Sequence, residues 1–336
     1  MNTVAIEERA KIEPARLPSW EFGRDYVVTM RPYLLFVSGI TGVVGLSLAP
    51  SIAIGSTLIL GLAFFLSYGF GQALTDCFQL DTDSLSAPYR PLVQGTIRRR
   101  EVLVVSLVGL VAIGVMLTLY SYWNIPFAAA AVAGLATYTY FKRRWWAGPF
   151  YNAWIVAVVA LLGYLSGLGA AGARITGSVQ LVATLVAVFF GYANFVLTGY
   201  YKDISADRAT GYRTFPVVFG LRLSSYASDA FAFLTVLACA VAVCTTLGDA
   251  RLVTGHAVAF AFLVAGLVRV VLTQVRIHRV RNENEAHRAI DPVVRAYILL
   301  LAAVTLFQKP GWAPALLVFY ALFLAALERR TMKEQI

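Results

Sequence analysis

Long apolar stretches without charged residues recur along the whole chain and constrain its fold more than any other feature. A helix that crosses a bilayer needs about 20 mainly apolar residues. The stretches between charges predict ten such helices, at 33–50, 52–75, 102–122, 125–141, 149–171, 177–200, 230–248, 252–270, 292–308 and 311–327. Only 14% of the residues are charged, against about 25% in a soluble domain. We therefore expect an all-α, polytopic membrane helix bundle of nine or ten transmembrane helices.

The basic residues fall almost entirely on one side of this predicted bundle. Of the 28 lysines and arginines, 24 lie in the two terminal segments or in alternate loops, and Arg174, Arg251 and Lys309 lie on the other side. Loops rich in lysine and arginine stay in the cytosol. We expect a cytosolic arm over 1–32, a transmembrane domain over 33–328 and a cytosolic tail over 329–336. The net charge of +10 then reflects topology and contact with anionic membrane lipids, not nucleic acid.

Two aspartate-rich segments lie on the predicted cytosolic side, each at the end of a long apolar helix and each followed by a basic loop. The first runs from Asp76 through Gln79 to Asp83, and the second contains Asp203 and Asp207. In a continuous helix, Asp76, Gln79 and Asp83 would share one face, and so would Asp203 and Asp207. The two segments suggest two pseudo-repeated halves.

This grouping of carboxylates predicts a metal site. Carboxylates held close together repel each other unless a cation joins them. Mg²⁺ prefers oxygen ligands and is typically held by one or two carboxylates together with substrate phosphates. Arg90, Lys142 and Lys202 would add positive charge around a diphosphate. A single acidic pair of this kind is usually a solvated loop, but two on the same side favour a shared site.

At these residues the chain resembles the UbiA-type intramembrane prenyltransferases. The first segment, followed by Pro88-Tyr89-Arg90-Pro91-Leu92, is similar to the first signature of that family. The stretch from Lys202 to Gly220 follows the second signature closely. Tyr138, four residues before Lys142, and Asn152 in the next predicted helix also match. The likeness covers roughly residues 26–308.

The resemblance implies transfer of an isoprenyl group from a prenyl diphosphate to a lipophilic acceptor, with an aromatic compound as the expected kind. It implies Mg²⁺ as cofactor, with Asp76, Asp83, Asp203 and Asp207 as catalytic and metal-binding residues. The residues implied to bind the diphosphate are Arg90, Lys142, Lys202, Gln79, Tyr138 and Asn152. Aromatic side chains near the motifs are candidates for stabilising an allylic cation, namely Tyr138, Tyr140, Phe150, Tyr151, Tyr192 and Phe195.

The first segment departs from the family pattern, because Thr75 replaces an asparagine and Gln79 replaces the middle aspartate. Two explanations compete. In one, Gln79 is a neutral metal ligand and Asp81 faces solvent; helix geometry favours this. In the other, the helix ends early, the chain turns near Leu80, and Asp81 takes the place of the missing carboxylate. The departure also leaves open a membrane terpene cyclase that needs no acceptor. A transporter is disfavoured, because the aspartates lie at helix ends and not at mid-membrane.

Overall fold

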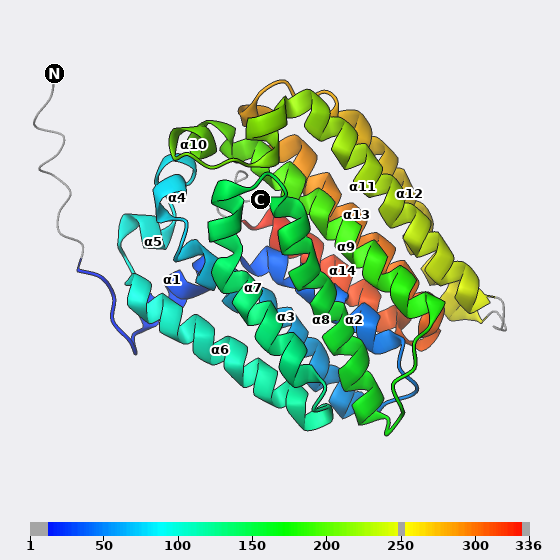
Figure 1. The fold of residues 1–336 in the computed structure, drawn as a ribbon. Helices are drawn as coiled ribbons and strands as arrows, with labels where there is room; N and C mark the ends of the chain where they lie inside the picture. The colour runs from blue at the N-terminus through cyan, green and yellow to red at the C-terminus, as the bar shows by residue number, and fades with distance from the viewer. Residues whose placement is uncertain (1–12, 248–252, 331–336) are drawn as a thin grey trace, which may run out of the picture.

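The computed structural model describes residues 13–247 and 253–330, and over these ranges the chain is almost entirely helical (Figure 1). Residues 1–12 of the predicted arm, residues 248–252, which include Arg251, and residues 331–336 of the predicted tail lie outside the described residues. The expected all-α architecture is confirmed. Apart from helices, the described chain contains one isolated bridge, between Ala15 and Ile97.

Each of the ten predicted spans corresponds to a long helix, although the helix over 215–247 is broken at Gly220, which has non-helical backbone angles (φ 75°, ψ 168°). These helices are α2 (Leu35–Ser47), α3 (Ile54–Asp76), α6 (Arg99–Tyr120), α7 (Asn124–Arg144), α8 (Gly148–Ala170), α9 (Val179–Gly199), α11 (Phe215–Leu247), α12 (Thr254–Ile277), α13 (His287–Gln308) and α14 (Ala313–Glu328). Four short helices connect or precede them: α1 (Trp20–Met30), α4 (Leu80–Ser86), α5 (Pro91–Gln94) and α10 (Ile204–Ala209). Helix α1 belongs to the predicted arm and packs on α3.

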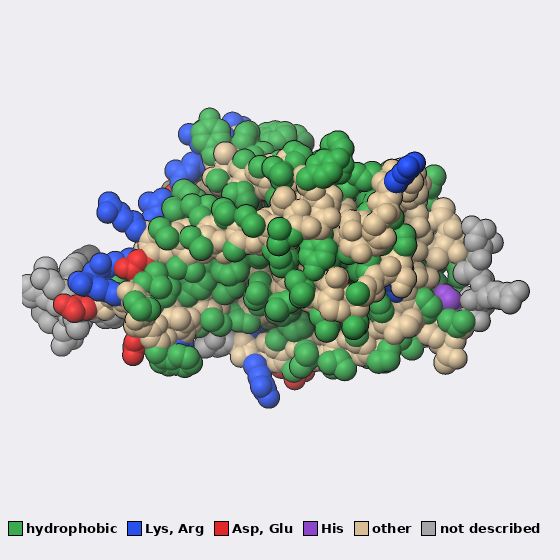
Figure 2. All heavy atoms as spheres, turned by 90° about the horizontal axis from the view of Figure 1, so that it is seen from below, with side chains coloured by type: hydrophobic (Ala, Val, Ile, Leu, Met, Phe, Trp, Pro, Cys, Tyr) green, Lys and Arg blue, Asp and Glu red, His purple; other side chains and the backbone are tan. Residues whose placement is uncertain are grey.

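In the described ranges, eight helices are long and apolar enough to cross a membrane, or nine if the bent pair Trp20–Met30 and Pro32–Ser47 is one span. Helix α7 is not among the eight, because alanine, threonine, tyrosine and three terminal cations make it less apolar. Large hydrophobic side chains are nevertheless exposed on the outside of the bundle (Figure 2). A soluble protein rarely exposes so much apolar surface, so these side chains face lipid.

Helix α13 occupies the centre of the bundle and packs against α2, α9, α11 and α12. It is buried along nearly all of its apolar length. On the other side of α2, glycines permit a very close approach to α8. A Cβ added at Gly163 would lie 2.2 Å from the carbonyl oxygen of Gly42, and one at Gly45 would lie 1.9 Å from that of Ala160. Small residues at such crossings let membrane helices pack backbone to backbone.

The short helices α4, α5 and α10 lie at one end of the bundle (Figure 1). Helix α4 contacts both α5 and α10, although the start of α10 lies 124 residues after the start of α4. The loop between α12 and α13 reaches the same end, where its turn Glu283–Glu285 (η4) contacts the turn Tyr200–Asp203 (η3). Both aspartate segments are therefore at one end of the fold.

Candidate functional site

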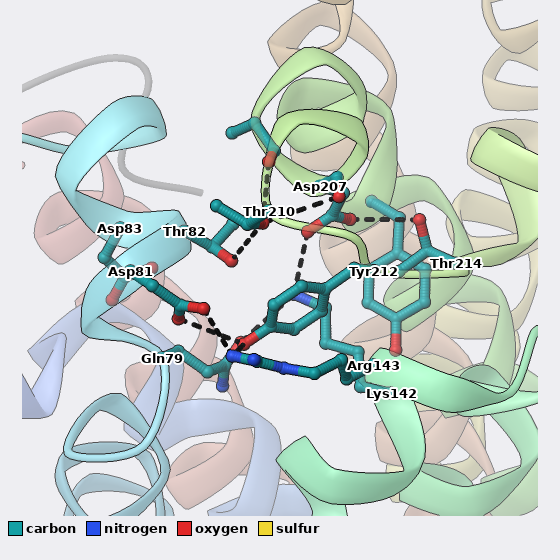
Figure 3. Close-up of polar contacts among 12 residues, drawn as sticks. Gln79, Asp81, Thr82, Asp83, Lys142, Arg143, Asp207, Thr210, Tyr212 and Thr214 are labelled. Atoms are coloured by element: carbon teal, nitrogen blue, oxygen red, sulfur yellow. Dashed lines mark hydrogen bonds and ion pairs between the residues drawn. The ribbon is translucent and has the colours of Figure 1, made fainter.

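The two aspartate segments face each other across the end of the bundle. The Oγ1 atoms of Thr82 in α4 and Thr210, just after α10, are 3.1 Å apart. The side chains of Asp83 and Asp207 lie on either side of this contact (Figure 3). The structure thus brings together two segments that the sequence predicted to share a site.

The first segment is not the continuous helix that we expected, and that expectation is wrong. Helix α3 ends at Asp76, Gln79 has non-helical backbone angles (φ −118°, ψ 17°), and α4 begins at Leu80. Asp81 and Asp83 then occupy the first turn of α4, where negative charge is favourable beside the free N–H groups of a helix. The break turns α4 across the end of the bundle towards α10.

Asp76 is buried and held by a residue that sequence reasoning missed as part of the site. The Arg31 guanidinium Nη2 donates to both carboxylate oxygens of Asp76 at 3.0 Å. Arg31 ends α1 with a left-handed backbone (φ 54°). In the sequence it is one of the basic residues of the predicted arm 1–32, which indicate only topology. Gln72 Nε2 also donates to Asp76 Oδ1 at 2.6 Å. Because Gln72 lies one helical turn before Asp76, its position could have been inferred from helical spacing.

Arg90 joins the two carboxylates of the first segment. Its Nη1 pairs with Asp83 Oδ2 and lies 3.9 Å from Asp76 Oδ1. Burial raises the pKa of the Asp83 carboxyl above its usual range, although the Arg90 guanidinium opposes this. Burial also acts to lower the pKa of Arg90, but the nearby carboxylates of Asp83 and Asp76 more than offset it, so that pKa is raised. Arg90 therefore remains charged and binds both acids.

Lys142 joins the first segment to the second. Its Nζ donates to Gln79 Oε1 at 3.0 Å and lies 3.7 Å from Asp207 Oδ1. The rings of Tyr200 and Tyr212 flank the ammonium group, at 5.1 and 5.2 Å from their centroids. The Thr214 hydroxyl donates to the other carboxylate oxygen of Asp207 at 3.0 Å. Gln79 therefore faces the site through its interaction with Lys142 (Figure 3).

Asp81 lies apart from this cluster. It pairs with Arg143 and accepts a 3.3 Å hydrogen bond from the Tyr212 hydroxyl. The side chains of Asp81 and Arg143 are 39% and 40% exposed. The chain does turn near Leu80, as the second explanation requires, but Asp81 turns to Arg143 and not to Asp76 and Asp83.

The remaining predicted residues surround the cluster. Lys202 and Asp203 are half-buried in the turn before α10, and the charge of Asp203 acts on both Asp83 and Arg90. The Tyr138 and Tyr200 hydroxyls are 2.6 Å apart. Asn152 lines a cavity next to the acids.

That cavity lies between α3, α6, α7 and α8 and is lined mainly by apolar side chains. Gln72, Thr75 and Asn152 form its polar end. Phe64 also lines it, eleven residues before Thr75 on α3, so the cavity extends by about 16 Å along that helix. Of the aromatic candidates, Tyr192 lines the cavity, and Tyr68, which we had not singled out, lines it too.

The oxygen donors fit a Mg²⁺ ion that is shared with a diphosphate. Among residues 13–247 and 253–330, no three histidine, cysteine or acidic side chains are placed to enclose a metal ion by themselves. Mg²⁺ rarely needs such a cage, because substrate phosphates and water complete its coordination. Asp76 and Asp83 meet at Arg90, and on the opposite wall Asp207 Oδ1 is buried without a hydrogen-bond partner.

Comparisons with known proteins agree with these features. The model of the family described as the UbiA prenyltransferase family matches residues 36–290. The digeranylgeranylglyceryl phosphate synthase of Thermococcus kodakarensis is 30% identical over 217 residues, which cover 63% of this chain and 75% of that protein. The solved structure of a UbiA homolog from Aeropyrum pernix has a TM-score of 0.67 at 19% identity, covering 80% of this chain and 96% of that one. A UbiA homolog from Archaeoglobus fulgidus, bound to DMAPP and Mg²⁺, has a TM-score of 0.62 at 18% identity, covering 85% and 99%.

The buried position of Lys142 gives a prediction for stability. Its side chain is 5% exposed and that of Asp207 is 0% exposed. Replacing Lys142 with Met leaves Asp207 buried without its cation, so the free energy of unfolding should fall by about 3–5 kcal/mol. The matched control is Arg143→Met, which breaks a half-exposed pair and should cost about 1 kcal/mol or less. Denaturant titration in mixed micelles measures both values, and equal losses would contradict the buried role of Lys142.

Proposed function

The chain belongs to the UbiA prenyltransferase family and is a multi-pass membrane prenyltransferase, and we propose that it transfers an isoprenyl group from a prenyl diphosphate to a lipophilic acceptor with the help of Mg²⁺. One observation carries the proposal. The polar end of the apolar cavity, at Gln72 and Thr75, directly adjoins the cluster of buried acids and cations at Asp76. A molecule with a charged head and an apolar tail matches that combination.

The cations of the cluster would bind and neutralise the diphosphate. Arg90 approaches the carboxylates of Asp76 and Asp83 on one side of the site, and Lys142 approaches that of Asp207 on the other. Arg31, whose side chain is partly buried, adds a third cation beside Asp76. Lys202 lies in the half-buried turn beside Asp203. Cationic donors fixed in place stabilise the negative charge that develops on a departing diphosphate.

The four aspartates would hold the metal, with Asp76 and Asp83 on one side and Asp203 and Asp207 on the other. Mg²⁺ bound there would supply Lewis-acid neutralisation of the leaving group. Gln79 contributes a neutral oxygen that currently accepts from Lys142. Its neutrality lowers the negative charge of the first segment by one relative to the family pattern.

The cavity would hold the prenyl chain and keep water from its reactive end. When the bond between the first prenyl carbon and the diphosphate oxygen breaks, an allylic cation forms. The aromatic rings of Tyr68 and Tyr192, which line the cavity, are suited to stabilise this cation. A new bond from that carbon to the acceptor completes the transfer, and the proton that the acceptor loses passes to the departing diphosphate.

The relatives bear on the acceptor. Their name, digeranylgeranylglyceryl phosphate synthase, supports a glyceryl phosphate lipid as acceptor and a geranylgeranyl donor for this chain. The aromatic acceptor suggested by the sequence stays a prediction. The one-sided distribution of basic residues supports a cytosolic location for the site and for both termini.

Product analysis by mass spectrometry tests the proposed function. Purified protein is incubated with Mg²⁺, geranylgeranyl diphosphate, and either a geranylgeranylglyceryl phosphate or an aromatic acid acceptor. We expect acceptor-dependent prenylated product that disappears in excess chelator. An Asp203→Asn/Asp207→Asn double variant lacks both proposed carboxylate ligands of the second segment. It should lower the rate of prenyl transfer at least a hundredfold. Full activity in chelator would refute the metal-assisted mechanism, and a cyclic terpene formed without acceptor would identify a cyclase instead.

If the cavity holds the prenyl chain, the size of the side chains that line it should limit the length of the chain that the enzyme accepts. Ala131 of α7 is buried and lines the cavity, whereas its neighbour Ala130 is exposed. Phenylalanine at position 131 should fill the space needed by a long chain. We expect Ala131→Phe to lower kcat/KM for geranylgeranyl diphosphate at least tenfold while sparing dimethylallyl diphosphate.

The control is Ala130→Phe, which places the same ring towards lipid and should change neither value by more than about twofold. Equal losses with both donors in Ala131→Phe would show that the cavity does not hold the prenyl chain.

A further inference from the structure

A second cavity, unrelated to the aspartate cluster, lies where the ends of α12, α13 and α14 meet. Its volume is about 580 Å³. Five arginines line it: Arg269, Arg276, Arg279, Arg295 and Arg330. Arg269 and Arg276 lie on α12 and Arg295 on α13, while Arg279 follows the end of α12 and Arg330 the end of α14. None of these three helices contributes a predicted site residue. Five guanidinium groups around one cavity repel each other unless anionic groups neutralise their charge.

Acidic side chains of the protein neutralise only part of the positive charge of these five arginines. Asp291 accepts from Arg295 Nε at 2.5 Å and lies 3.4 Å from Arg330 Nη1. Glu285 also lines the cavity, but one of its carboxylate oxygens accepts from the backbone N–H of Arg281. The two acids leave an excess of three positive charges among the five arginines.

Two features show that the guanidinium groups have unused capacity to bind. Arg330 is only 10% exposed, yet its buried Nε has no hydrogen-bond partner. Within the described part of the chain, no ion pair joins Arg269, Arg276 or Arg279 to an acid. Guanidinium groups bind phosphate oxygens through paired N–H donors. The cavity therefore suits a phosphate group better than a single carboxylate.

The position of the cavity relates it to the membrane interface. Arg276 and Arg279 are exposed near the end of α12. Arg269 lies eight residues before the last residue of α12, Ile277, which is about 12 Å further into the spanning segment. The cavity therefore extends from the end of α12 to its apolar part, which is the same range of depth that a lipid occupies from its headgroup to its acyl chains. Basic pockets between transmembrane helices of this kind bind anionic headgroups.

The geometry points to this cavity as a binding site for a phosphate-bearing anion, with the headgroup of an anionic phospholipid as the occupant that its depth favours. Free phosphate shares the same chemistry and is the other source to distinguish. The site lies at the same end of the bundle as the aspartate cluster. The backbone N–H of Ser205 donates to Glu283 at 2.8 Å, which links α10 to the loop that borders the cavity.

Ligand binding to the full-length, delipidated protein in detergent tests this assignment. The probes are dioctanoyl phosphatidylglycerol, dioctanoyl phosphatidylcholine and inorganic phosphate, and the readouts are native mass spectrometry and the shift in unfolding temperature. We expect saturable binding of phosphatidylglycerol, with phosphatidylcholine at least tenfold weaker. The Arg276→Gln/Arg279→Gln variant should bind phosphatidylglycerol at least tenfold more weakly than the unmodified protein.

The matched control is Arg222→Gln, which removes an exposed arginine from α11, outside the cavity, and should leave the affinity within about twofold. Binding of phosphatidylglycerol without phosphate would assign the site to lipid, whereas comparable binding of phosphate, lost in the double variant, would assign it to the free anion. Unchanged binding in the double variant, an equal loss in Arg222→Gln, or equal affinity for phosphatidylcholine would overturn the proposal. No prenyl diphosphate is present, so the result is independent of the proposed transferase activity.

Discussion

Compensation of buried negative charge is the constraint on which the rest of this structure depends. Asp76, Asp83 and Asp207 are 3%, 6% and 0% exposed, and an unpaired carboxylate at such positions would be strongly destabilising. Each acid is paired with a cation from another part of the chain: Arg31 after α1, Arg90 before α5 and Lys142 on α7. The ion pairs therefore tie at least five elements together at one end of the bundle. The same charges would let this end accept a metal and a diphosphate.

The remainder of the bundle separates this polar end from lipid. Close glycine contacts bring α2 against α8, and the buried helix α13 supports α9, α11 and α12. The space left between α3, α6, α7 and α8 is apolar and ends at the acids. The packing of the helices thus places charged groups at one end of the bundle and an apolar cavity next to them. This combination is the physical basis of the proposed prenyl transfer.

Much of this arrangement could be predicted from the sequence, because it depends on composition and local spacing. Uncharged stretches of helical length located all ten long helices, and the aspartates and Lys142 were recognised from their motifs. The break between Asp76 and Leu80 was harder to predict, since helical spacing alone favoured a continuous face. Arg31 was missed because it lies 45 residues from Asp76 and reaches it only through a left-handed turn. Asp81 turns to Arg143, a long-range ion pair that no local pattern reveals.

The central claim is that α4 and α10 hold the two acidic segments against each other, and a cysteine cross-link between them tests it most directly. Thr82→Cys and Thr210→Cys are introduced together in a chain whose Cys77, Cys239 and Cys244 are replaced by Ala. The native hydroxyls of these threonines are 3.1 Å apart, so mild oxidation should form a disulfide that mass spectrometry detects. The control pair uses Ser84→Cys with Thr210→Cys; Ser84 is exposed on α4 and should not form the cross-link. Absence of the 82–210 disulfide, or equal cross-linking of the control, would contradict the account.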